Sequence, residues 1–158
     1  MNEKNELIVT RVFNAPVNLV WRAWTEPEHF MKWWGPKEFI SPTCEIDLRV
    51  GGKYLFCMSQ KNGGRDMFNT GVFQEIIPNE KLVCTQSMSD KDGNVISPSQ
   101  MGMGPEFPDE MIVDVTFEDI GGKTKLTMRQ IGMPASKMKD MAGAGWNQSF
   151  DKLEESLK

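Results

Sequence analysis

The chain has 158 residues, with 18 lysines and arginines, 22 aspartates and glutamates, and a formal net charge of −4. This length suits one domain with a hydrophobic core, so we expect a single domain over residues 1–158. The basic residues stand singly among acids, which argues against a nucleic-acid partner because phosphate binding needs clustered lysine and arginine. No apolar run is long enough to span a membrane, and the N-terminus is unlike a secretory signal, so we expect a cytoplasmic protein.

The first part of the chain predicts one strand followed by two short helices. Leu7–Phe13 is rich in β-branched residues, as strands are. Pro16 suits the first position of a helix, and the apolar spacing after it predicts a helix to about Trp24. Thr25 and Glu28 have the spacing of a capping box, which predicts that a second helix begins there.

The second helix carries an aromatic face. Phe30, Trp33 and Trp34 have the i, i+3, i+4 spacing that places side chains on one side of a helix. Gly35 and Pro36 end the helix. A helix this short is unstable alone, so its aromatic face must be buried. We expect it to form one wall of an apolar cavity.

From residue 43 the apolar period changes to two, which predicts strands joined mostly by tight turns. Strands in this order make an antiparallel meander. The expected strands are 43–49, 54–59, 67–77, 82–88, 111–118 and 125–130. Residues 90–109 form a long loop that interrupts them, and both a lid over a cavity and plain surface disorder are open interpretations.

Residues 135–158 predict a long amphipathic helix with small residues near its start. An antiparallel sheet with one long helix on one face is an α+β domain, and a sheet of seven strands curls strongly. A curled sheet closed by a helix can leave a hollow between the two. The apolar stripe of the helix consists of Met138, Ala142, Trp146, Phe150, Leu153 and Leu157.

Several stretches resemble the START-like (SRPBCC) superfamily, and most closely its branch of homologues of the activator of the heat-shock-protein-90 ATPase. The resemblance implies a helix-grip fold, in which a seven-stranded antiparallel sheet wraps around the C-terminal helix and encloses a deep cavity. Relatives bind hydrophobic molecules, and a few act as cyclases. The matching stretches are Arg11–Glu28, Trp33–Pro36, Asp47–Gly52, Glu75–Leu82, Gly122–Thr127 and Gly145–Leu153.

The candidate ligand-binding residues are those whose position in the strand alternation or on the apolar helix face places them on the inner side of such a fold. Each of them can also be ordinary core packing, and the argument for a cavity is collective. Tyr54, Asn69 and Gln130 would supply its polar groups. The candidates are Trp33, Trp34, Phe39, Tyr54, Phe56, Met58, Asn69, Met111, Val113, Met128, Gln130, Ala142 and Trp146. Arg11 shares the inward parity, so we expect it to meet an anionic ligand group or a strand acid such as Glu75.

No catalytic set, metal site or cofactor motif stands out. His29 is the only histidine, so we expect no histidine cluster, Ser-His-Asp triad or zinc site with several histidines, and we expect His29 itself at the surface. Cys44, Cys57 and Cys84 fit neither a disulfide framework nor a zinc site, so we expect reduced, buried thiols. No glycine-rich stretch matches a phosphate-binding pattern.

Three functional hypotheses follow. The first is non-catalytic binding of a hydrophobic or aromatic small molecule in the cavity between sheet and C-terminal helix. The second is an enzyme of the polyketide cyclase or hydrolase type, in which Tyr54, Glu75 or His29 moves protons. The third is a co-chaperone-like module that binds a chaperone and stimulates its ATPase, which the resemblance alone supports. The sequence leaves open whether the protein is a monomer or a homodimer.

Overall fold

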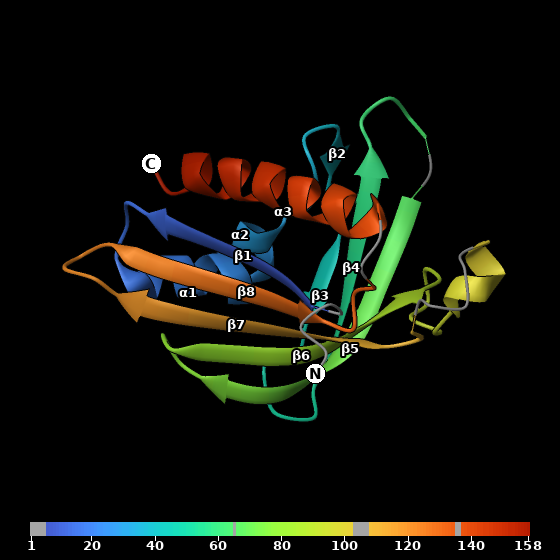
Figure 1. Cartoon of the computed structure of the whole chain (residues 1–158), viewed down its shortest axis with the longest axis horizontal. Coiled ribbons are helices and arrows are strands. Elements are labelled where there is room, and N and C mark those ends of the chain that lie inside the picture. Colours follow the sequence, from blue (N-terminus) through green and yellow to red (C-terminus); the bar gives the residue numbers. More distant parts are fainter. Residues whose placement is uncertain (1–5, 65, 103–107, 135–136) are drawn as a thin grey trace.

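The described part of the chain forms one antiparallel sheet, two short α-helices after its first strand and a long C-terminal helix (Figure 1). The structure is a computed structural model that describes residues 6–64, 66–102, 108–134 and 137–158. In chain order the elements are β1 (Glu6–Phe13), α1 (Val17–Thr25), α2 (Pro27–Phe30), β2 (Phe39–Ile40), β3 (Cys44–Ile46), β4 (Lys53–Gln60), β5 (Asp66–Ile77), β6 (Lys81–Ser89), η2 (Pro98–Met101, a 3-10 helix), β7 (Met111–Asp119), β8 (Thr124–Ile131) and α3 (Lys137–Ser156).

The sheet has the strand order β1-β8-β7-β6-β5-β4-β2, and β3 pairs with β4 beside β2. The first and last strands are therefore neighbours, although they lie more than a hundred residues apart in sequence. Seven of the strands are those expected from the sequence, and the eighth is the two-residue strand β2 at the edge. The sheet curves, and α3 lies across it (Figure 1). The predicted α+β helix-grip class is confirmed.

The two helices after β1 differ from the prediction at their junction. Thr25 is not a cap of the second helix, because it is the last residue of α1 and its hydroxyl donates to the Trp21 carbonyl oxygen at 2.9 Å. Glu26 takes the N-cap position of α2 without a side-chain cap, and its carboxylate pairs with Arg22 instead. The predicted capping box is wrong, because a threonine within a helix bonds the carbonyl four residues earlier.

Aromatic rings from both helices, β4 and α3 fill much of the space between sheet and helix. Trp33 is fully buried, and its indole N–H donates to the Ala23 carbonyl oxygen at 2.9 Å. Its ring lies against those of Trp24, at 4.8 Å between centroids, and Phe30, at 5.1 Å. Phe150 of α3 meets Trp33 at 6.2 Å. Such offset and edge-to-face pairs add to the free energy of burial itself.

The helix α3 is held to β1 by a charged contact as well as by packing. Arg11 points inward, as its parity predicts, but its guanidinium donates to Asp151 at 2.7 Å and to the Asn147 carbonyl oxygen at 3.2 Å. Both partners lie on α3, so the expectation of a ligand anion or a strand acid is wrong. The alternation of residues along β1 predicts the face on which Arg11 lies. The partner of Arg11 comes from α3, the helix that covers this face.

The segment between β6 and β7 begins with a tight turn and the 3-10 helix η2. Val95 bridges to Ser89, and Ser97 and Gln100 form a capping box on η2. Residues 103–107 lie outside the described residues, so the choice between a lid and plain disorder for residues 90–109 stays a prediction. Within the described ranges, no helix has the length and apolar character needed to cross a membrane.

A glycine in β5 gives a test of the sheet packing. A Cβ at Gly71 would lie 1.9 Å from the Thr85 carbonyl oxygen and 2.7 Å from the Tyr54 ring. We expect Gly71→Ala to lower the free energy of unfolding by about 3 kcal/mol, since overpacking forces backbone shifts. Chemical denaturation measures the change.

The matched control is Gly143→Ala in α3, where the nearest atom, Leu7 Cδ1, lies 3.4 Å away. Alanine is favoured over glycine in a helix by about 1 kcal/mol, so this variant should be as stable as the parent or slightly more stable. Equal stability of both variants would contradict the packing described for β5 and β6.

Candidate functional site

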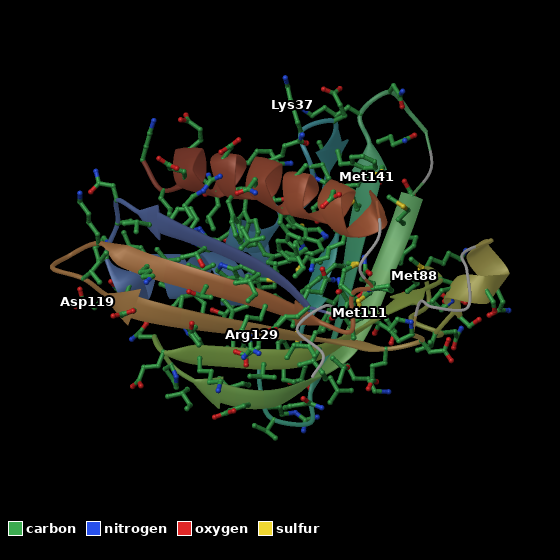
Figure 2. All side chains as sticks on the ribbon, viewed as in Figure 1. Lys37, Met88, Met111, Asp119, Arg129 and Met141 are labelled. Atoms are coloured by element: carbon green, nitrogen blue, oxygen red, sulfur yellow. The ribbon has the colours of Figure 1, made fainter. Side chains whose placement is uncertain are left out.

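A pocket of about 400 Å³ lies where α3 begins, at one end of the sheet. We call it the mouth pocket. Figure 2 shows Met88, Met111 and Met141 at this end of the molecule, whereas Asp119 lies at the opposite end. The described lining of the mouth pocket consists of Pro36, Met67, Asn69, Gln86, Ser87, Met88, Pro98, Pro108, Asp109, Met111, Gln130, Met133, Met141 and Ala142.

A second hollow of about 200 Å³, the middle pocket, adjoins the mouth pocket and lies along α3. The two share seven lining residues, among them Gln86, Gln130 and Ala142. The lining residues that the middle pocket has and the mouth pocket lacks are Trp34, Met58, Gly145, Trp146 and Ser149.

A third hollow, the inner cavity, has a volume of only about 30 Å³. Trp34, Gln86 and Trp146 line both the middle pocket and the inner cavity, so the three hollows lie in series. Rings and apolar side chains make up most of its lining: Trp24, Phe30, Trp34, Tyr54, Phe56, Phe73, Leu82, Cys84, Gln86, Val113, Val115 and Trp146. The deep cavity implied by the resemblance is thus largely filled by aromatic rings, and the wider space lies towards the start of α3.

A hydrogen-bonded group of side chains joins these hollows. Gln130 on β8 is 4% exposed, and its amide N–H donates to the Gln86 side-chain oxygen on β6. The Trp146 indole N–H donates to the Gln130 side-chain oxygen at 3.3 Å. Buried amides need such partners, because an unpaired polar group away from water costs free energy. The group therefore fixes the side chains that separate mouth pocket and inner cavity.

The inner cavity is electrically neutral at ordinary pH. Burial raises the pKa of the Tyr54 hydroxyl well above its usual value, and this hydroxyl donates to the Thr85 carbonyl oxygen at 2.6 Å. Burial also raises the pKa of the Cys84 thiol to about 12. Both groups stay protonated, since a low-dielectric surrounding disfavours the charged form.

The loop after α2 is tied to α3 and so positions Pro36 at the mouth pocket. The ammonium group of Lys152 donates to the carbonyl oxygens of Pro36, at 3.3 Å, and Phe39, at 3.0 Å. The backbone N–H of Lys37, labelled in Figure 2, donates to the Gln148 side chain at 3.0 Å. Burial lowers the pKa of Lys152. These contacts fix one wall of the pocket to the helix that forms another.

The structure brings many of the sequence-predicted site residues together. Trp34, Met58, Asn69, Met111, Gln130, Ala142 and Trp146 line the mouth pocket or the middle pocket. Tyr54, Phe56 and Val113 line the inner cavity. Trp33, Phe39 and Met128 line none of the three, and Trp33 and Met128 are fully buried packing residues.

Sequence reasoning missed Gln86, Met88, Met133 and Met141, all in the lining of the mouth pocket. The sequence could have indicated Gln86 and Met88 on β6, because alternate residues of a strand face the same side and these two continue the series of Leu82 and Cys84. Met133 follows the turn after β8, and Met141 is 65% exposed, so neither stands out by periodicity.

The three residues considered for proton transfer lie apart. Tyr54 is buried, and Glu75 is exposed on β5. His29 lies at the surface on α2, where its Nε2 is 3.4 Å from the Glu26 carboxylate. Within the described ranges no group of three or more histidine, cysteine, aspartate or glutamate side chains could hold a metal ion.

An antiparallel sheet curled around a long C-terminal helix, with two short helices after the first strand, defines an α+β helix-grip domain of the START-like (SRPBCC) superfamily. The chain belongs to the family of activator of Hsp90 ATPase homolog 1-like proteins, whose model matches residues 14–158. The fold is thus that of a ligand-binding type of domain.

Solved structures of bacterial proteins have the same fold. A protein of Nitrosomonas europaea is 27% identical, with a TM-score of 0.79 over 99% of this chain and 96% of that chain. A protein of Chromobacterium violaceum is 26% identical, with a TM-score of 0.78 over 97% and 96% of the two chains. The AHSA1 protein of Silicibacter pomeroyi, 19% identical with a TM-score of 0.75 over 96% of each chain, shares the fold. No curated protein matches the sequence.

The cysteines provide a test of the packing around the site. Cys44, Cys57 and Cys84 are free thiols, and burial raises the pKa of Cys44, like that of Cys84, to about 12. At pH 8 the thiolate fraction of these two should be about 1,000-fold lower than that of an ordinary thiol. We expect iodoacetamide to leave both unmodified in the native protein, measured by peptide mass mapping. The same reaction in urea should label all three, and rapid native labelling of Cys84 would contradict the closed lining of the inner cavity.

Proposed function

We propose that the protein binds a hydrophobic small molecule in the mouth pocket and the middle pocket, without converting it. The observation that carries this proposal is the volume of about 400 Å³ in a mostly apolar lining at the start of α3. Small-molecule sites in proteins have volumes of about 300–1,000 Å³, apolar walls and a few polar groups that orient the ligand. Asn69, Gln86 and Gln130 are such groups.

The methionines of the mouth pocket support a ligand whose shape is not narrowly defined. Met67, Met88, Met111, Met133 and Met141 belong to its lining. An unbranched thioether side chain has three rotatable bonds and a polarizable sulfur, so it adapts its conformation to different apolar surfaces. The rigid rings of Trp34 and Trp146 in the middle pocket supply flat surfaces for an aromatic ligand.

A neighbouring hollow is less suited to an apolar molecule. It has a volume of about 460 Å³ and lies along β5 and the turn after β6. Its lining includes Asp66, Asp90 and Lys91, which are charged and hydrated. The apolar lining of the mouth pocket therefore favours that pocket as the site.

The two other hypotheses have weaker support. An enzyme would need acid and base groups at the ligand, and of Tyr54, Glu75 and His29 only Tyr54 lines one of the three hollows, where its hydroxyl is bonded to a backbone carbonyl. A co-chaperone role is supported by the family description alone. It predicts stimulation of the ATPase of a chaperone of the Hsp90 type, which a steady-state ATPase assay measures directly.

Filling the pocket tests the proposal. Ala142 on α3 lines both the mouth pocket and the middle pocket. We expect Ala142→Phe to abolish ligand binding, because the added ring occupies the space. The measurement is a thermal-shift screen with fatty acids, sterols, flavonoids and polyketide-like aromatics. A ligand at a hundredfold excess over its Kd stabilises the native state by about 2.7 kcal/mol, which corresponds to a rise of about 5–10 °C in Tm.

Ala144→Phe is the matched control, since Ala144 is exposed on the same helix and lines none of the hollows. It should bind like the parent protein. Quenching of the fluorescence of Trp34 and Trp146 by the same ligand gives a second readout. Equal binding by Ala142→Phe and the parent would locate the ligand elsewhere and overturn the proposal.

A further inference from the structure

Two buried indole N–H groups at the inner cavity have no hydrogen-bond partner among the residues that the structure describes. They belong to Trp24 and Trp34, residues that are 6% and 5% exposed. The indoles of Trp33 and Trp146, buried beside them, donate to the Ala23 carbonyl oxygen and to Gln130. Buried donors are nearly always paired, because a donor removed from water without a partner costs free energy. An acceptor beside either of these donors is therefore favoured, and both tryptophans belong to the lining of the inner cavity.

The other polar groups of the inner cavity do not supply this acceptor. The Tyr54 hydroxyl donates to the Thr85 carbonyl oxygen, and the Gln86 side-chain oxygen accepts from Gln130. No acidic or basic side chain belongs to the lining of this cavity in the described part of the chain. A charged group would be desolvated there without a counter-charge, which is far more costly than burial of a neutral group.

The size of the inner cavity limits what can enter it. Its volume of about 30 Å³ suits a group the size of one water molecule, such as an oxygen atom, and excludes a ring. A ring can lie in the middle pocket, whose volume is about 200 Å³. Trp34 and Trp146 line both spaces, so the two spaces adjoin and a substituent on a ring in the middle pocket lies within reach of the inner cavity.

We propose that the ligand is an uncharged aromatic molecule with a carbonyl or similar acceptor oxygen. This oxygen enters the inner cavity and accepts a hydrogen bond from the indole N–H of Trp34, of Trp24, or of both. This inference rests on the proposed function and adds the chemistry of the ligand to it. The methionines of the mouth pocket tolerate variation in the rest of the molecule, while the two indoles select the acceptor and fix the ligand's orientation.

The test uses three probes of similar shape: 9-fluorenone, which carries a carbonyl, fluorene, which has a methylene at the same place, and fluorene-9-carboxylate, which has an anion there. Dissociation constants come from tryptophan quenching and calorimetry. We expect the parent protein to bind fluorenone at least about fivefold more tightly than fluorene, since one buried donor gains a partner. The carboxylate should bind more weakly than fluorene.

The Trp34→Phe and Trp24→Phe variants remove one donor each and keep an aromatic ring. Neither variant removes a hydrogen bond seen in the described part of the chain, because neither indole N–H has a partner there. The ratio of the Kd of fluorene to the Kd of fluorenone should fall to about one in at least one of the two variants or in the double variant. Trp21→Phe is the matched control: Trp21 is buried but lines none of the three hollows, so the preference should persist.

A second readout does not depend on the stability of the variants. In the parent protein, fluorenone should shift the indole N–H resonance of Trp34 or Trp24 downfield, and leave that of Trp33 unchanged. Equal binding of fluorenone and fluorene, or a preference that survives in the double variant, would overturn the inference and leave the proposed function intact. Binding of no probe, together with a negative ligand screen, would overturn both.

Discussion

The fold depends on the burial of Trp33. This side chain is wholly buried, and its indole N–H donates to the last turn of α1 at the Ala23 carbonyl oxygen. Rings from α1, α2 and α3 surround it, namely Trp24, Phe30 and Phe150. Since α2 has only four residues, packing around this ring, and not helix propensity, holds the segment in place. The same packing sets the positions of the next residues, Trp34 and Pro36, at the candidate site.

The hollow lies at one end of the molecule because the sizes of the side chains differ along α3. Towards the end of the helix, Phe150 and Leu153 are fully buried and fill the space above the sheet. Near its start, Ala142 and Gly145 line the mouth pocket or the middle pocket, and space stays unfilled there because alanine has only a methyl group and glycine has no side chain. Close packing in the rest of the core is what confines the mouth pocket and the middle pocket to this end.

The lining combines adaptable and fixed elements. The methionines around the mouth pocket can change rotamer without large cost. Deeper in, the chain from Trp146 through Gln130 to Gln86 is held by hydrogen bonds, and Lys152 ties the loop after α2 to α3. A ligand would therefore meet a flexible entrance and a rigid interior. In our proposal, the indole donors without a partner among the described residues select the ligand there.

The sequence by itself determined the order of the strands along the chain, the buried faces of β7 and β8, the aromatic turn and the long C-terminal helix, because these follow from local periodicity and turn residues. The same pattern predicted the α+β class, and the resemblance of short stretches to a known superfamily added the helix-grip fold. Contacts between distant segments could not be obtained in this way. Arg11 found its partners on α3, and Gln130 reached Gln86 across β7. The expected cap at Thr25 was wrong because α1 includes that residue. Only the tertiary structure decided where space remained unfilled, since a cavity is the difference between the volume that the backbone encloses and the volume of side chains from many elements.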